Sequence, residues 1–199
     1  MISLWASVVL PRASATTKGL NQIVTPDIQP VGVLSLSLQG EHQGIGNAIQ
    51  VQMEYGVTRR FEVATFGGFR PRETSLAAEY GLVARGPYLL ATGFLNWTDR
   101  GGKPQTFLEG GYFLGRHRLV AGAVRVESHT QAMGGYAYQA TPRLLLQTDY
   151  QSGSGNAATA GFTYSLSPQV QINTAAYYTN DSPHRALPYA VVSWNIQVR

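Results

Sequence analysis

Carboxylates at alternating positions are the most chemically suggestive side chains of this sequence. Seven of the eleven carboxylates, Glu41 and Glu127 among them, have the parity of the polar face in segments where apolar and polar residues alternate. Successive side chains of a β-strand point to opposite faces, so in strands these carboxylates would share one face of the sheet. The five that we expect to line the interior are Glu54, Glu62, Glu79, Glu109 and Asp149. Carboxylates along a concave wall favour cations. The first hypothesis is therefore an acidic interior, either as a water-filled path or as a packed polar network.

The histidines do not indicate an enzyme or a metal centre. His42, His117, His129 and His184 are the only four, and no two have the spacing of metal ligands. Ser128 and His129 are adjacent, so on a strand they would point to opposite faces and could not form the hydrogen-bonded pair that nucleophilic catalysis requires. The sequence predicts no enzyme, no metal site and no cofactor.

The elements that must carry these residues are segments of roughly ten residues with alternating polarity. In residues 47–57, for example, Ile49, Val51 and Met53 share one face, and Gln50 and Gln52 share the other. The alternation predicts twelve strands, of which the seventh is the least regular: 31–42, 47–57, 60–69, 73–84, 88–98, 105–114, 118–127, 131–140, 143–152, 157–166, 169–179 and 187–198.

The connections between these segments alternate in length. Links such as Thr58-Arg59 and Ser167-Pro168 are tight, whereas those from Gln43 to Gly46 and from Asp99 to Pro104 are longer. Short turns on one rim and longer loops on the other are typical of membrane barrels. We therefore predict an all-β fold over residues 31–199, an up-and-down antiparallel transmembrane β-barrel of about twelve strands.

Aromatic residues on the apolar face fall near two levels. Tyrosines near the ends of the downward strands form one group, and residues near the opposite rim form the other. The first group is Tyr55, Tyr80, Tyr112, Tyr138 and Tyr164; the second is Trp97, Tyr150 and Tyr178. Two aromatic girdles are typical of barrels whose rings meet lipid headgroups on both sides. The pattern predicts a lipid bilayer as the partner.

Composition excludes several other classes of protein. Only 13% of the 199 residues are charged, about half of the soluble norm, and there is no cysteine to form a disulfide or a thiolate site. No stretch approaches the roughly 20 apolar residues of a spanning helix. The formal charge is +4, but the basic residues are spread over turns on both rims, so we expect no nucleic-acid partner.

The N-terminal residues differ from the rest. Residues 1–15 combine an apolar run with Ala13-Ser14-Ala15 and resemble a secretory signal peptide that lacks its basic start. Residues 16–30 are polar, contain two prolines and have no period. We interpret residues 16–30 either as a periplasmic lead-in to the barrel or as a small plug.

Strand number, turn asymmetry, girdles and an alternating last strand together resemble the small, porin-like outer-membrane β-barrels of Gram-negative bacteria, over about residues 31–198. The resemblance implies the bacterial outer membrane and a narrow channel for small ions or solutes, with a cation preference from the acidic interior, or else a structural barrel. The alternative is a secreted, β-rich structural subunit that assembles through its N-terminal arm. An outer-membrane lipid hydrolase lacks its nucleophile–base pair. The sequence gives no oligomeric state.

Overall fold

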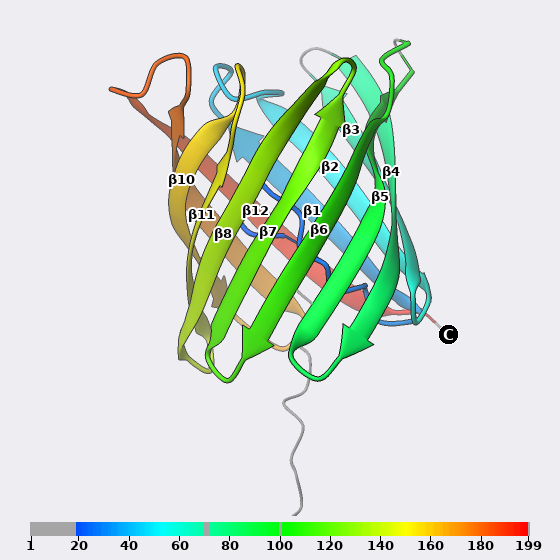
Figure 1. Ribbon diagram of the computed structural model, residues 1–199. Helices are drawn as coiled ribbons and strands as arrows, with labels where there is room; N and C mark the ends of the chain where they lie inside the picture. Colours follow the sequence, from blue (N-terminus) through cyan, green and yellow to red (C-terminus); the bar gives the residue numbers. More distant parts are fainter. Residues whose placement is uncertain (1–18, 70–71, 100, 199) are drawn as a thin grey trace, which may run out of the picture.

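The chain folds into one closed antiparallel β-barrel (Figure 1). The structure, a computed structural model, describes residues 19–69, 72–99 and 101–198, so the predicted signal peptide lies outside the described residues. Each strand pairs with the next along the chain, and β1 closes the barrel by pairing with β12. The predicted up-and-down barrel is confirmed.

All twelve predicted strands are present, and each begins and ends within two residues of its predicted bounds. They are β1 (Val33–Glu41), β2 (Ile49–Thr58), β3 (Phe61–Phe69), β4 (Arg72–Arg85), β5 (Tyr88–Thr98), β6 (Gln105–Leu114), β7 (His117–Val126), β8 (His129–Thr141), β9 (Leu144–Gln151), β10 (Ala157–Ser165), β11 (Val170–Thr179) and β12 (Ala186–Gln197). Among the described residues, no helix is long and apolar enough to cross a membrane.

The outer wall is apolar. Side chains such as Leu38, Met53, Leu108, Leu146 and Val192 are 44–56% exposed on the outside of the barrel. Their strand neighbours point inward and are mostly polar, as the alternation predicts. An apolar surface that surrounds a whole molecule is far larger than the patches that water-exposed monomers tolerate.

The two rims differ as predicted, but not at every connection. On the rim where the C-terminal strand ends, four hairpins have two-residue links and the fifth has residues 166–169. On the opposite rim the loops 42–48, 99–104, 152–156 and 180–185 are longer. Two connections on that rim are as short as the tight turns of the other rim. Only two residues separate the end of β3 at Phe69 from the start of β4 at Arg72, and only Glu127 and Ser128 join β7 to β8. Glu127 adopts a φ of 51°, a positive value that is common in tight two-residue hairpin turns.

The barrel is not empty. Residues 19–32 run through its interior from the middle of the barrel to the short-turn rim, where Gly32 donates its N–H to the Gly56 oxygen over 2.8 Å (Figure 1, dark blue). Leu20, Asn21, Ile23, Thr25 and Gln29 of this segment are all buried. We call residues 19–32 the inner segment. Its contacts decide how much of the lumen remains open.

Candidate functional site

The barrel interior holds the predicted acidic residues, but it does not hold them as one ring. Glu62, Glu79, Glu109 and Asp149 are all 5% exposed or less, and Glu54 is partly buried. Glu62 of β3 and Glu79 of β4 lie directly opposite each other in the pairing of the two strands. Glu54 lines the same small space inside the barrel as these two residues. The other two lie on β6 and β9. The acidic wall therefore consists of Glu54, Glu62 and Glu79, on three consecutive strands.

Asp149 binds the inner segment. Its Oδ2 accepts hydrogen bonds from the backbone N–H groups of Asn21 (2.6 Å) and Gln22 (3.1 Å), and its Oδ1 accepts one from the Thr159 hydroxyl (2.9 Å). A buried carboxylate is tolerated when such donors surround it. Asp149 thus helps to attach the inner segment to the barrel wall. Its Oδ2 atom is bonded to the backbone of Asn21 and Gln22.

Asn21 is the centre of this attachment, and sequence reasoning did not find it. Its Nδ2 donates to Thr159 Oγ1 (2.9 Å), its Oδ1 accepts from Gln147 Nε2 (2.7 Å), and its backbone oxygen accepts from the Tyr177 hydroxyl. Residues 16–30 have no period that could single out Asn21, because the segment is neither strand nor helix. The only available signal was its polar composition.

Next to this polar attachment the inner segment makes an apolar one. Leu20 and Ile23 pack into a buried cluster on the inner faces of β6 to β9: Phe107, Val120, Val124, Met133, Ala137 and Leu145. Alternation predicts a polar inner face, and this expectation is wrong for Val120 and Val124 of β7 and for Met133 and Ala137 of β8. Those positions are apolar because they contact protein rather than water, which also explains why the seventh strand looked irregular.

The barrel wall is recessed where the inner segment passes. An added Cβ at Gly135 would lie 2.2 Å from Leu20 Cδ1, and one at Gly161 would lie 2.8 Å from Asn21 Oδ1. At Gly56 an added Cβ would lie within 2.2–2.7 Å of the segment's backbone. Real Cβ atoms do not approach other atoms so closely, so only glycine fits at these inward positions of the strands.

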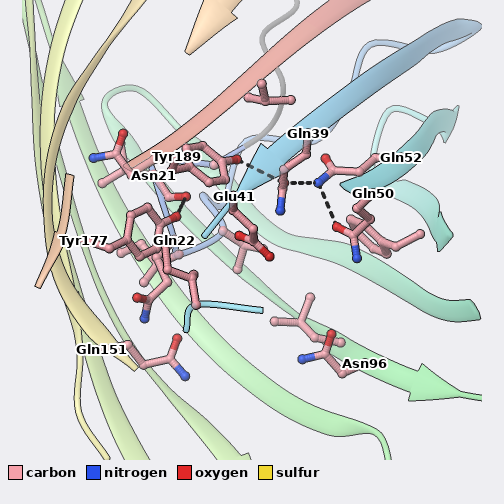
Figure 2. Close-up of a pocket in the computed structure, with 18 of the residues that line it drawn as sticks. Asn21, Gln22, Gln39, Glu41, Gln50, Gln52, Asn96, Gln151, Tyr177 and Tyr189 are labelled. Carbon is pink, nitrogen blue, oxygen red and sulfur yellow. Dashed lines mark hydrogen bonds between the residues drawn. The ribbon is translucent and has the colours of Figure 1, made fainter. Parts of the chain in front are cut away.

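Above the inner segment, toward the longer loops, a cavity of about 320 Å³ remains (Figure 2). Most of its polar wall consists of amide side chains, with two tyrosines and one carboxylate. These residues are Asn21, Gln22, Gln39, Gln50, Gln52, Asn96, Gln105, Gln151, Asn173, Tyr177, Tyr189 and Glu41. No lysine, arginine or histidine belongs to the described lining. We call this space the upper cavity.

A second and smaller space, of about 60 Å³, lies along the acidic wall. Glu54, Glu62 and Glu79 line this space on one side, and Val24 of the inner segment contributes to it as well. Val24 also lines the upper cavity, as do Gln52, Phe66 and Leu95. The two spaces therefore adjoin beside Val24. We call the smaller one the acidic crevice.

The predicted girdle residues are on the outside of the wall. Tyr80, Trp97, Tyr150, Tyr164 and Tyr178 are 39–53% exposed there. The other three are partly exposed: Tyr55, Tyr112 and Tyr138. That these rings meet lipid headgroups stays a prediction.

Trp97 reaches the outer face only because β5 bulges. Asn96 has a φ of 54°, and the pairing of β4 with β5 shifts between Ala78–Phe94 and Leu76–Trp97. The extra residue of a bulge moves the following side chain to the opposite face. Trp97 consequently packs edge-on against Phe94, with ring centroids 5.9 Å apart.

The described histidines occupy separate places. His117 lies on the outer wall, where Nδ1 and the Tyr136 hydroxyl are 2.8 Å apart, and His42 Nδ1 accepts the N–H of Gly44 at the longer-loop rim. No group of three or more potential metal ligands occurs among the residues that the structure describes.

No protein family model and no curated protein matches the chain. Solved structures do. The barrel is similar to "KdgM porin" with a TM-score of 0.59 at 9% identity over 81% of this chain and 98% of that one. It is also similar to the NanC porin, with a TM-score of 0.56 at 8% identity over 80% and 97% of the two chains. The resemblance to small porin barrels is thus confirmed at the level of the fold.

Proposed function

We propose that this protein is a narrow, porin-like channel of a bacterial outer membrane that favours cations. The apolar exterior supports a lipid environment, because only a bilayer would cover that surface all round the barrel. Similarity to two porin structures at nearly their full length supports a channel rather than another kind of barrel. The partners are the bilayer and small ions or solutes. That the protein is not an enzyme stays a prediction.

The observation that carries the proposal is the position of the inner segment relative to the acidic wall. Against β6 to β11 the segment is in direct contact with protein, through the apolar cluster on one side and Asn21 on the other. On the β2 to β4 side the segment contacts the acidic wall through the Gln29 N–H, which donates to Glu62 Oε2 over 2.5 Å. Beside Val24 the acidic crevice remains, and it adjoins the upper cavity. We infer that residues 19–30 act as a partial plug, and that ions pass between Val24 and the acidic wall.

The charge of that crevice sets the preferred ion. Carboxylates in a narrow, low-dielectric passage concentrate cations and repel anions. One similar structure is of the KdgM porin in complex with disordered oligogalacturonate, a polyanion. An acidic crevice and an upper cavity without basic residues would disfavour such a ligand in this chain.

The electrostatic test is a pair of neutral substitutions. In planar bilayers with a salt gradient, the reversal potential of the native protein should show a cation preference. In Glu54→Gln with Glu79→Gln it should move toward zero, and high salt should reduce the difference because it screens charge. Glu127→Gln, at the exposed β7–β8 turn, is the matched control and should leave the potential unchanged. A protein that folds and never conducts would overturn the channel and leave a structural barrel.

The steric test uses the residue that borders both spaces. Val24→Ala should raise the single-channel conductance because it widens the crevice, and Val24→Phe should lower it. If both variants assemble and conduct like the native protein, the path does not run beside Val24.

The alternative, a secreted subunit that assembles through its N-terminal arm, has less support. The described part of that arm is bonded inside its own barrel, and the closed sheet presents no unpaired edge to which a neighbour's arm could add.

A further inference from the structure

We propose that the upper cavity is a binding site for one small, uncharged polyhydroxy solute, of the size of a monosaccharide or a sugar alcohol. The inference deepens the proposed channel by naming a solute that would enter it. Binding to the cavity does not require conduction, so the two proposals can fail separately.

Two buried polar atoms on residues that line the cavity have no hydrogen-bond partner among the described residues. One is the donor Nε2 of Gln22, on the inner segment, and the other is the acceptor Oδ1 of Asn173, on β11. Asn173 is 6% exposed, so bulk water does not solvate it freely. Buried polar groups are nearly always paired in native proteins, and each unpaired group costs free energy. A ligand that both accepts and donates would satisfy both atoms.

The rest of the wall is arranged for the same chemistry. Gln39 Oε1 accepts from the Tyr189 hydroxyl (3.1 Å) and from Gln52 Nε2 (2.5 Å), and Gln52 Nε2 also lies 3.1 Å from Gln50 Oε1. These bonds hold a row of amides in place at the cavity wall (Figure 2). Each amide carries both donors and acceptors, and so does each hydroxyl of a polyol. Amides therefore suit a molecule with several hydroxyls better than they suit an ion.

Charge and size narrow the class of ligand further. Among the described residues of the lining, Glu41 is the only carboxylate and there is no basic residue, so an anion would find no counter-charge. A volume of about 320 Å³ is at the small end of ligand sites, which typically span roughly 300–1,000 Å³. The rings of Tyr177 and Tyr189, 5.2 Å apart, provide the apolar surface against which the C–H face of a sugar can pack.

The test measures binding of glucose and sorbitol to the detergent-solubilised full chain by saturation-transfer NMR titration. Glucuronate and glucosamine serve as the anionic and cationic counterparts. We expect both neutral probes to bind and glucuronate not to bind. Failure of both neutral probes, or tighter binding of either charged sugar, would overturn the proposal. Bilayer current is not part of this readout.

The variants locate the site. Gln22→Met keeps the length of the side chain, and no other described residue forms a hydrogen bond with that side chain on which folding would depend. The substitution should weaken binding about three- to tenfold, the loss of one hydrogen bond. Asn173→Leu should do the same. Gln139→Met makes the same chemical change in a lumen residue at the short-turn rim, in a separate small cavity, and should leave the affinity unchanged. Equal weakening by Gln22→Met and Gln139→Met would place binding elsewhere.

Discussion

Gly135 on β8 offers the sharpest test of whether the inner segment occupies the lumen in a membrane. An added Cβ there would lie 2.2 Å from Leu20 Cδ1, 3.2 Å from Ile23 Cδ1 and 3.0 Å from the Cβ of Asp149. Leu20 and Ile23 are 9% and 2% exposed in a packed cluster, so they have little room to move away. Overpacking of this kind typically costs about 1–3 kcal/mol. Gly135→Ala should therefore destabilise the protein by about that amount.

The neighbouring glycine provides the control. Gly134 points to the outer face, where an added Cβ would meet only the Val120 oxygen at an ordinary 3.6 Å. Gly134→Ala should thus change stability by no more than about 0.5 kcal/mol, as most surface substitutions do. The same residue type is changed in the same strand, so any effect on strand propensity is shared.

The assay is urea unfolding of the barrel in lipid vesicles, followed by the fluorescence of its tryptophans. Leu20→Ala should partly rescue Gly135→Ala, because it removes the atom that the new methyl group would meet, and a double-mutant cycle should show this as a non-additive term. Gly135→Ala should also make the single-channel current larger or less steady. If the Gly134 and Gly135 variants are equally stable and conduct alike, the inner segment does not lie against β8.

Three further predictions follow from the same contacts. Leu146→Arg should block membrane assembly, because a cation at mid-bilayer on a barrel's outer face costs about 2–4 kcal/mol. Leu146→Met should assemble normally, and a gel of membrane fractions compares the two variants. The native chain has no cysteine, so single cysteines can report which rim faces the outside. Ser182→Cys, in a longer loop, should react with a membrane-impermeant maleimide on intact cells, and Pro142→Cys, at the short-turn rim, should not. Equal labelling would contradict the placement of the longer loops outside the cell. Tyr177→Phe should lower the free energy of unfolding by about 1 kcal/mol, through loss of the hydrogen bond to the Asn21 oxygen. An unchanged urea midpoint would show that this bond does not stabilise the protein.

The sequence by itself determined the wall of this barrel. Alternation in segments such as residues 47–57 predicts both the strands and which residues face inward, because a strand has a side-chain period of two that neighbouring strands do not alter. The up-and-down order follows from connections too short for anything except hairpins between neighbours. Inward placement of Glu62, Glu79 and Glu109 came from the same local rule.

Only the tertiary structure decided what fills the lumen. Asn21 meets Gln147 and Tyr177 across 126 and 156 residues of chain, and no local pattern in an irregular segment encodes such partners. The apolar inward positions Val120 and Val124 have the same cause, since their contacts Leu20 and Ile23 come from the far end of the sequence. Trp97 faces outward, as its place in the predicted girdle requires, but it does so through a bulge at Asn96 that a strict period of two does not contain. Local periodicity specifies a strand and its faces, whereas the occupant of a closed lumen depends on contacts between residues far apart in the chain.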